Sequence, residues 1–387
     1  MKKVWDFLNT TLGLGLLMLL VLVLVALFGG RNVVGLAGQP LATVAPVVEV
    51  TPTSIPRAES GFRAENIEIA KEVQLTTEGR NSFSSWISWS PLSTSVLVNR
   101  FNGRTIKDQN VTYLLTDIWK ITVDGNDFQK LAADAFGARW SEDGKMILYL
   151  STPDADTQDV YVMNEDGSNQ TKVASGERGE VYWLPHRRIA YPRENRIWVA
   201  DTTGKSAILA EKIELIHSPK ARRYNPYFPS PDGDKIAFID KGRLLIVKLD
   251  GTQVKITDDL TDYSRADLSV SWSPSGEKLT YITGGNQPKL WIVNAEGSDP
   301  TMLVSGEMEF FEHPRWFPDG KAILFSRFPT GTEKYFSIYV VNDDGSGLKD
   351  LTGDRGTQEF PELSPDGRKV AFFREGNLYI AFLSLNE

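Results

Sequence analysis

Aspartates beside or near glycine are the side chains in this sequence that most resemble a set of metal ligands. Their positions are Asp166, Asp232, Asp319, Asp343, Asp344 and Asp366. A calcium loop of the EF-hand type needs oxygen ligands at alternating positions and a glutamate at its twelfth position, and no stretch here supplies both. Asp-Gly pairs are typical of tight turns, so we interpret these aspartates as turn residues. The denser acidic stretch of Asp154, Asp156 and Asp159 is interpreted as a surface loop, with a weak cation site as the alternative.

Histidine and serine do not form the patterns of a zinc site or a nucleophilic site. His186, His217 and His313 are far apart and form no H-E-x-x-H pair, and the chain has no cysteine. No G-x-S-x-G motif occurs, and the nearest pattern, residues 345–347, is a predicted hairpin turn. We therefore expect no catalytic residue, no metal and no cofactor, and we interpret the chain as a non-enzyme. An enzyme that collects its residues from several strands is the alternative.

The candidates for binding a partner are charged and aromatic residues in or beside the longest stretches between predicted strands, because loops on a rigid scaffold commonly carry binding sites. They are Arg100, Arg104, Lys107, Arg222, Arg223, Arg265, Phe310, Phe311, Glu312, His313, Arg315 and Arg327. On a chain of formal net charge −8, the basic members would suit an anionic partner or a lipid headgroup, and a solvated charged rim is the alternative. Trp86, Phe310 and Phe311 would have to line a groove if the chain bound a polysaccharide.

The elements that position these residues come from a repeat. Seven copies of a three-part phrase, spaced by 43 to 51 residues, lie between Trp89 and Leu363. The phrase has a tight turn such as WSPSG from Trp272, an alternating stretch such as IYVVNDDG from Ile338, and a short strand such as KDLT from Lys349. Alternation that runs into Asp-Gly predicts a β-hairpin. Each copy therefore predicts four antiparallel strands, and radial repetition of such units predicts an all-β, seven-bladed β-propeller.

The seventh copy lacks its fourth strand within the sequence. The phrase EVQLTTEGR from Glu72 matches KDLTGDRG from Lys349. We therefore expect residues 72–78 to supply the outer strand of the last blade, because an open sheet edge is normally covered. The propeller is predicted over residues 72–387.

The N-terminal region predicts a membrane anchor. Residues 12–28 are uncharged and mostly apolar, and with their uncharged neighbours they are long enough to cross a bilayer. Lys2 and Lys3 precede this run, which places the N-terminus in the cytoplasm and the propeller outside. A cleaved signal peptide is the alternative, although its apolar region is usually shorter. The predicted organisation is a cytoplasmic tail at residues 1–10, one transmembrane helix at 11–30 and a Pro/Thr/Val-rich spacer at 31–71.

The turn, hairpin and outer-strand phrases together resemble the TolB-type propeller repeat, a relative of the WD-repeat class. The resemblance covers all seven copies, about four fifths of the chain. TolB carries an α/β domain before its propeller, whereas residues 1–71 here hold the predicted helix and spacer. The resemblance implies a binding propeller that docks partners on one face or in its central channel.

These observations predict a single-pass protein of a bacterial cell membrane with its propeller on the extracytoplasmic side. We expect a protein-interaction scaffold or a subunit of an envelope complex, with protein partners. A channel-site enzyme, or a propeller that binds a glycan or small molecule, is the alternative. The net charge of −8 argues against nucleic acid as a partner.

Overall fold

The structure, a computed structural model, describes residues 61–386 apart from short gaps. The gaps are 80–82, 109–110, 152–156, 178, 195, 210–216, 219–222, 225–226, 241, 258–269, 285–286, 308, 329–334 and 354. Within the described residues, no helix is long and apolar enough to span a membrane. The predicted membrane helix, residues 11–30, lies outside them.

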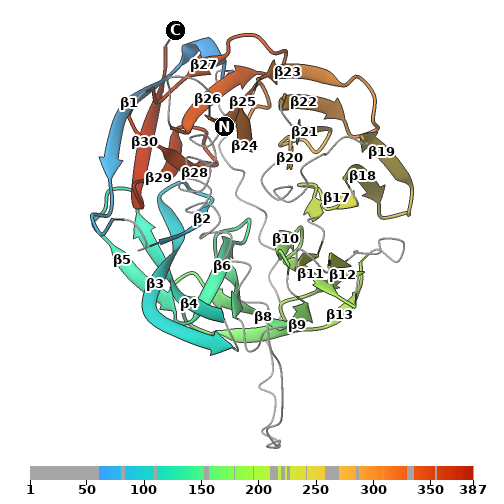
Figure 1. The fold of residues 1–387 in the computed structure, drawn as a ribbon. Helices are drawn as coiled ribbons and strands as arrows, with labels where there is room; N and C mark the ends of the chain where they lie inside the picture. Colours follow the sequence, from blue (N-terminus) through green and yellow to red (C-terminus); the bar gives the residue numbers. More distant parts are fainter. Residues whose placement is uncertain are drawn as a thin grey trace, which may run out of the picture.

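The described residues form seven four-stranded antiparallel sheets arranged in a ring (Figure 1). The predicted all-β propeller of seven four-stranded blades is therefore confirmed. Blade 1 contains β2 (Phe83–Trp89), β3 (Ser95–Asp108), β4 (Val111–Thr122) and β5 (Phe128–Ala132). Blade 2 contains β6 (Ala135–Trp140), β7 (Met146–Ser151), β8 (Thr157–Asn164) and β9 (Thr171–Glu177). Blade 3 contains β10 (Tyr182–Leu184), β11 (Arg188–Arg193), β12 (Arg196–Ala200) and β13 (Ser206–Ile208).

The remaining blades follow the same order from the innermost to the outermost strand. Blade 4 contains β16 (Tyr227–Pro229), β17 (Lys235–Asp240), β18 (Arg243–Lys248) and β19 (Gln253–Thr257). Blade 5 contains β20 (Val270–Trp272), β21 (Lys278–Thr283), β22 (Lys289–Asn294) and β23 (Thr301–Ser305). Blade 6 contains β24 (Phe310–Trp316), β25 (Ala322–Phe328), β26 (Ser337–Asn342) and β27 (Lys349–Asp350). A small pair, β14 (His217–Ser218) and β15 (Arg223–Tyr224), lies in the connection from blade 3 to blade 4.

Blade 7 joins the two ends of the described chain. It contains β28 (Gln358–Leu363), β29 (Lys369–Arg374), β30 (Asn377–Leu385) and, as its outer strand, β1 (Ile67–Gln74). The two end strands run antiparallel, with Ile67 opposite Leu385 and Gln74 opposite Tyr379, and they lie side by side in Figure 1. The outer strand thus begins five residues before the predicted segment 72–78 and takes in residues 67–71 of the predicted spacer.

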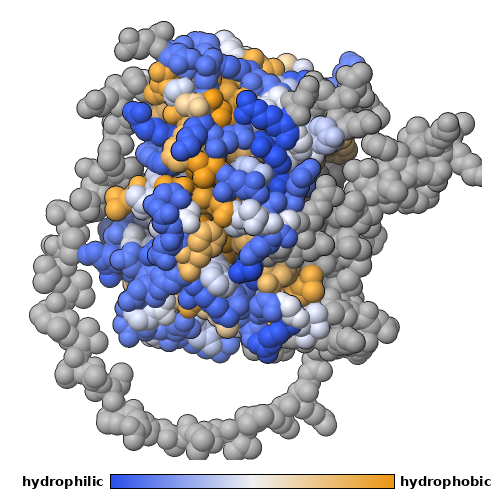
Figure 2. Space-filling model, turned by 90° about the vertical axis from the view of Figure 1, so that its left-hand side faces the viewer, coloured by the Kyte–Doolittle hydropathy of each residue, from blue (hydrophilic) through white to orange (hydrophobic). Residues whose placement is uncertain are grey.

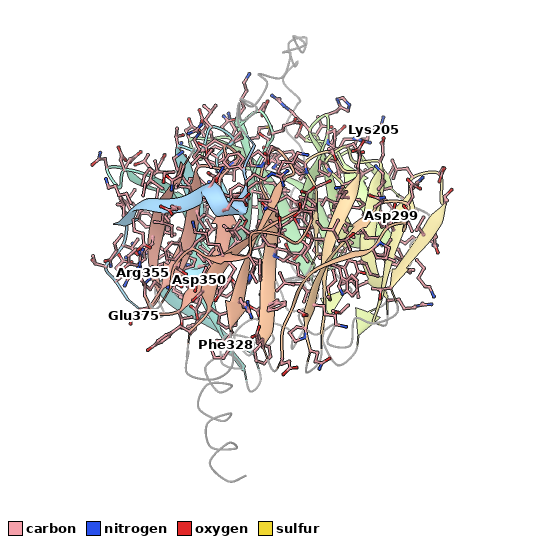
Figure 3. The ribbon with its side chains drawn as sticks, turned by 90° about the horizontal axis from the view of Figure 1, so that it is seen from above. Lys205, Asp299, Phe328, Asp350, Arg355 and Glu375 are labelled. Carbon is pink, nitrogen blue, oxygen red and sulfur yellow. The ribbon has the colours of Figure 1, made fainter. Side chains whose placement is uncertain are left out.

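The disc has two different faces, which Figure 3 shows from the rim. The turns from the first to the second strand and from the third to the fourth strand of each blade share one face, here called the turn face. Lys205 and Asp299 lie on it. The opposite face, here called the loop face, carries the other connections, with Phe328 and Glu375.

A short segment before β1 packs on the turn face. It includes the 3₁₀ turn η1 (Ala64–Asn66). Phe62 is fully buried, its ring lies 4.9 Å from that of Phe317, and its amide donates to the Asp319 carboxylate at 2.6 Å. The Ala64 amide donates to the side-chain oxygen of Asn342 at 2.8 Å. Residues 61–66 therefore bind to the turns of blades 6 and 7 instead of extending away from them.

The apolar core lies between neighbouring blades, and tryptophans of the turn phrase connect them. The indole of Trp316 donates to the Ser271 carbonyl of blade 5 at 3.2 Å, and that of Trp272 donates to the Phe228 carbonyl of blade 4 at 2.9 Å. Figure 2 shows the outer side of the disc near β1, where a narrow apolar band runs between polar residues. Ile69 of β1 belongs to the core cluster on this side.

One of the long stretches between predicted strands is itself a hairpin. It covers residues 99–117, and β3 and β4 continue through most of it. The turn-like pair Asn102-Gly103 lies in a bulge between Phe101 and Thr105, with Gly103 at φ 78°, and pairing resumes beyond it.

Candidate functional site

Three of the described innermost strands contain a β-bulge of the same form. Their registers shift between Phe136 and Arg139 in β6, between Glu312 and Arg315 in β24, and between Glu359 and Glu362 in β28. Each bulge holds one residue in the left-handed region: Gly137 at φ 65°, His313 at φ 55° and Phe360 at φ 54°. Bulges turn a strand locally and change the direction of the side chains that follow.

In all three strands, the residue two positions after the left-handed one is charged. These residues are Arg139, Arg315 and Glu362. The next residue in each case is the apolar one of the turn phrase, and Trp140 and Trp316 among them are buried. Since successive side chains of a strand point to opposite sides, the charged residue is directed away from this packing. The bulges therefore place charged groups where the innermost strands surround the propeller axis, the position of the central channel in this fold.

The charged residues form two ion pairs between neighbouring blades. Arg315 of blade 6 binds Glu362 of blade 7 through both Nε, at 2.8 Å, and a terminal nitrogen. Its other terminal nitrogen donates to the Pro314 carbonyl at 3.0 Å. Burial works to lower the pKa of Arg315, but Glu362 and then Tyr182 raise it, and the pKa lies above its usual range.

Arg139 forms the second pair and is also held by two aromatic rings. Its terminal nitrogen lies 2.8 Å from a Glu180 oxygen. Its guanidinium carbon lies 4.3 Å from the ring centroid of Trp86 and 4.5 Å from that of Tyr182, within range for cation–π attraction. The Trp86 indole donates to the Ala138 carbonyl at 2.9 Å, which anchors one ring of this clamp.

Tyr227 supports the other side of the clamp. Its hydroxyl donates to the Glu180 backbone carbonyl at 2.8 Å, and its ring meets that of Tyr182 edge-on at 5.3 Å. Burial, with smaller contributions from Tyr182 and Glu180, raises the pKa of Tyr227 well above its usual value, so the hydroxyl stays a donor. We call Trp86, Arg139, Glu180, Tyr182, Arg315 and Glu362 the inner belt. Its four charged side chains remain 25 to 36% exposed, so solvent and ligands can reach them.

His313 stabilises the bulge beside Arg315. Its side chain is buried, and its ring meets that of Phe360 edge-on at 5.2 Å. The Glu312 carboxylate lies 3.9 Å from its Nδ1. These contacts join the bulges of blades 6 and 7, so the two predicted residues Glu312 and His313 lie next to the inner belt.

The predicted residues Phe310, Phe311 and Arg327 lie together in blade 6, toward the loop face. Arg327 forms two hydrogen bonds with Glu309, at 2.8 and 3.0 Å. Its guanidinium also lies 5.8 Å from the ring centroid of Phe311, which is buried. Phe310 is 53% exposed and meets the ring of Phe328 at 6.3 Å, which leaves an aromatic surface open to solvent.

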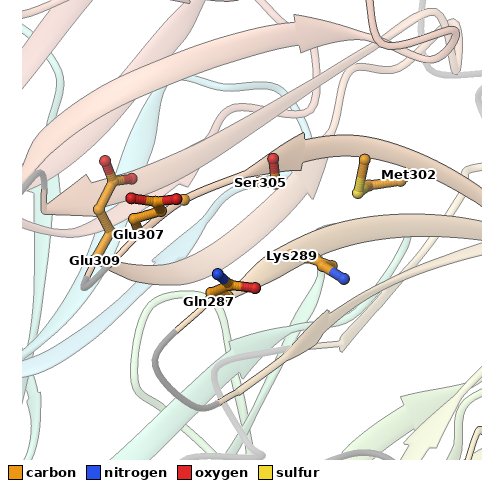
Figure 4. Close-up of a pocket in the computed structure, with 7 residues that line it drawn as sticks. Gln287, Lys289, Met302, Ser305, Glu307 and Glu309 are labelled. Carbon is orange, nitrogen blue, oxygen red and sulfur yellow. The ribbon is translucent and has the colours of Figure 1, made fainter.

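A shallow groove of about 420 Å³ lies beside this aromatic surface. Its lining comes from blades 5 and 6 and comprises Gln287, Lys289, Met302, Ser305, Gly306, Glu307 and Glu309. Figure 4 shows Glu307 and Glu309 together at one end and Met302 at the other. The Glu309 carboxylate already accepts hydrogen bonds from Arg327, so it offers less negative charge to a ligand in the groove than a free carboxylate would.

The remaining predicted residues do not join the inner belt. Arg100 of β3 is paired with Glu78 and lies 5.2 Å from the ring centroid of Trp119. Arg104 is paired with Asp134 at the base of the long hairpin. Lys107 belongs to β3 and Arg223 to β15, but their side chains are not among those described. Arg222 and Arg265 lie outside the described residues.

Four residues of the inner belt were not predicted. Arg139, Glu180, Tyr182 and Glu362 lie on or beside innermost strands, whereas the sequence argument concentrated on long loops. A usable signal was present, because a charged residue directly precedes the apolar residue of the turn phrase in three copies.

Among the described residues, no group of three acidic or histidine side chains could hold a metal ion. Asp166 and Asp232 accept hydrogen bonds from Ser168 and Ser230 of their own turns.

No family model matches the chain. It is similar to a tricorn protease homolog of Saccharolobus solfataricus, with 23% identity over 365 residues that cover 81% of this chain and 31% of that protein. A TolB homolog of Chlorobium luteolum is 33% identical over 130 residues, which cover 33% of this chain and 28% of that protein. The chain thus spans about a third of the length of either relative. The seven-bladed propeller fits the TolB-type repeat family.

Solved structures include a similar propeller domain, that of the Trilobed protease from Pyrococcus furiosus. The match has a TM-score of 0.53 and 13% identity, and it covers 80% of this chain and 96% of that domain. At this identity the likeness concerns the fold. That domain has an open velcro topology, whereas blade 7 here combines β1 with β30.

Proposed function

We propose that this chain is a membrane-tethered, extracytoplasmic β-propeller that binds a protein partner, as a scaffold or a subunit of an envelope complex. The inner belt is the observation that carries this proposal. Its arginines and glutamates are held in fixed geometry by bulges, rings and cross-blade pairs, and rigid, exposed groups of this kind suit recognition. The exposed aromatic surface around Phe310 adds a second contact area toward the loop face.

The tether is supported by the sequence and by the position of residue 61. Residues 12–28 carry no charge, and Lys2 and Lys3 precede them. Phe62 docks on the turn face, so the chain enters the propeller on that face. The loop face then lies on the opposite side of the disc from the attachment and is free for a partner.

Capture of the tagged full chain from membranes dissolved in mild detergent tests the binding role. We expect one protein to co-purify in near-equal amount with the wild type. The double variant Arg139→Gln, Glu362→Gln should lose it. Arg187→Gln should keep it, because Arg187 pairs with Asp143 on the turn face. Recovery of the chain alone, or the same partner yield from all three proteins, would contradict the proposal.

Alkaline carbonate washing of the membranes tests the tether. The full chain should stay in the membrane fraction, and a variant that lacks residues 1–30 should move to the wash. A shortened chain released without washing would indicate a cleaved signal peptide instead.

A second candidate is a propeller that works in peptide hydrolysis, favoured by the similarity to the tricorn protease homolog. Such a role predicts that the purified chain, alone or with its captured partner, hydrolyses or binds short peptides. A fluorogenic peptide panel would decide this. Activity that survives removal of the partner and falls with Glu180→Gln or Glu362→Gln would favour an enzyme over a scaffold.

A further inference from the structure

Three phenylalanine rings form a row across blade 6 at the loop face. Phe310 of β24 meets Phe328 of β25 at 6.3 Å, and Phe328 meets Phe336, just before β26, at 5.1 Å. Phe310 is 53% exposed, and Tyr335, next to Phe336, is 45% exposed. Figure 3 shows Phe328 at this face. Rings that hold one another in place and remain open to solvent are typical of contact sites for a partner.

The groove beside this aromatic row has an exposed apolar side chain at one end and carboxylates at the other. Met302 of β23 is 46% exposed, and Glu307 and Glu309 lie at the opposite end (Figure 4). A thioether side chain adapts to apolar groups of different shapes. The volume of about 420 Å³ lies in the range of sites for drug-sized ligands, so the groove is large enough for a few residues of a peptide.

The charges of the groove favour a ligand with a cationic side chain. Glu307 is exposed, and a carboxylate has several acceptor positions, so its contacts within the chain leave room for a donor from a ligand. Arg327 binds Glu309 and so neutralises one of the two carboxylates. Lys289 lies opposite Ser305 along the groove, and a backbone carbonyl of a bound peptide would suit its ammonium group.

We propose that the aromatic row and the groove together bind a short segment of the protein partner that carries a large aliphatic side chain beside an arginine or a lysine. The aliphatic side chain packs on Phe310, and the cationic side chain pairs with Glu307 and lies against the exposed rings. The net charge of −8 attracts such a segment from a distance. This inference rests on the proposed function and specifies the chemistry of the partner at the loop face.

Isothermal titration of the full chain in a nonionic detergent with the peptide acetyl-Leu-Arg-Leu-Arg-Leu-amide tests the site, and titration into detergent alone gives the baseline. This peptide should bind the wild type, and the acidic peptide acetyl-Leu-Glu-Leu-Glu-Leu-amide should not. Phe310→Ala should weaken binding roughly ten- to thirtyfold, the range for an aromatic side chain that anchors an interface. Glu307→Gln should weaken it roughly two- to fivefold, as expected for an exposed ion pair.

Two variants are matched controls. Phe128→Ala removes a ring that is 42% exposed on β5 of blade 1. Glu296→Gln removes a carboxylate that pairs with Lys248 on the turn face. Both should bind the basic peptide as the wild type does. Melting temperatures within about 2 °C of the wild type show that each variant is folded.

Three results would overturn the assignment. Equal affinity of the wild type and Phe310→Ala would remove the role of the aromatic row. Equal binding of the basic and the acidic peptide would remove the carboxylates as determinants of the partner. Equal binding of acetyl-Gly-Arg-Gly-Arg-Gly-amide would show that charge alone attracts the peptide and that the apolar contact is absent.

The two proposals can fail separately. If the basic peptide does not bind but the captured partner is still lost in the double variant of Arg139 and Glu362, the peptide site is wrong and the binding role stands. If the peptide binds and no partner is captured under any condition, the site stands and the scaffold role is wrong.

Discussion

Replacement of Phe62 by alanine should weaken the whole propeller, although this residue lies five positions before the first strand. Its side chain is fully buried, and it belongs to the core cluster with Phe317 and Phe372 of blades 6 and 7. A Cβ atom added to Gly367 would lie 2.6 Å from its ring, so the ring fills its space closely. Loss of a buried phenylalanine ring costs about 3–5 kcal/mol.

This free energy converts into a shift of the melting temperature. The propeller spans residues 61–386, or about 325 residues. An unfolding entropy of about 2.1 cal/mol/K per residue gives ~0.7 kcal/mol/K for the domain. Phe62→Ala should therefore lower Tm by about 4–7 °C in differential scanning calorimetry at pH 7. Phe128→Ala is the matched control, because Phe128 lies on outer strand β5 and is 42% exposed. It should shift Tm by about 1 °C or less.

Equal melting temperatures of Phe62→Ala and the wild type would refute the reasoning. In that case residues 61–66 would not belong to the folded propeller, and the chain would be attached through β1 alone. A large shift in Phe128→Ala as well would show that loss of any aromatic ring is harmful and would remove the specific role of Phe62.

Three further predictions concern the joins between blades. Gly367→Ala should lower the free energy of unfolding, measured with denaturant, by about 1–3 kcal/mol, because the new Cβ would meet the Phe62 ring and the backbone φ is 68°. The double variant with Phe62→Ala should lose less stability than the sum of the two single losses, because the smaller side chain makes room for the Cβ. Partial burial works to raise the pKa of the Glu72 carboxyl, but Arg374 and Arg355 lower this pKa below its usual range. The ionised carboxylate therefore stabilises the fold above the pKa that Glu72 has in the unfolded chain, and this stabilisation is lost as the pH falls through the lowered pKa. The Tm difference between wild type and Glu72→Gln should therefore shrink below about pH 4, and a constant difference down to pH 2 would contradict this. Trp316→Phe should lower the free energy of unfolding by about 1 kcal/mol more than Trp140→Phe does. The reason is that the Trp316 indole donates to a backbone carbonyl, whereas the Trp140 indole has no acceptor among the described residues. Equal losses of stability would argue against these hydrogen bonds as links between blades.

The repeated chemistry explains why the blades could be predicted from the sequence. Each turn and hairpin phrase is local, so its residues determine the strand ends without help from distant contacts. The phrase from Ile338 became β26 and the short strand from Lys349 became β27, within one residue of the expected starts. The extent of β1 was harder to predict, because residues 67–71 match no outer-strand phrase. Phe62 was not predicted at all, since one buried ring leaves no periodic pattern.

The candidate site was predictable only in part, for a different physical reason. Arg315, Glu312 and His313 were selected because they lie in or beside a long stretch between predicted strands, and the structure places them at or beside the inner belt. Their partners come from other blades, and pairing between blades depends on the closed ring. Bulges at His313 and Phe360 could not be predicted either, because neither residue type favours a left-handed backbone as glycine does.

The backbone at these two bulges is strained beside the charged residues of the inner belt. A residue other than glycine in the left-handed region costs of order 1–3 kcal/mol, and the bulges of blades 6 and 7 each contain one. Glycine would remove this strain, as Gly137 does in blade 2. The rings of His313 and Phe360 instead meet each other at 5.2 Å, a contact that glycine could not make. This contact joins the two bulges that hold Arg315 against Glu362. The strained backbone therefore lies where two blades position a pair of partly exposed charges, and the proposed binding role would give a reason for keeping it there.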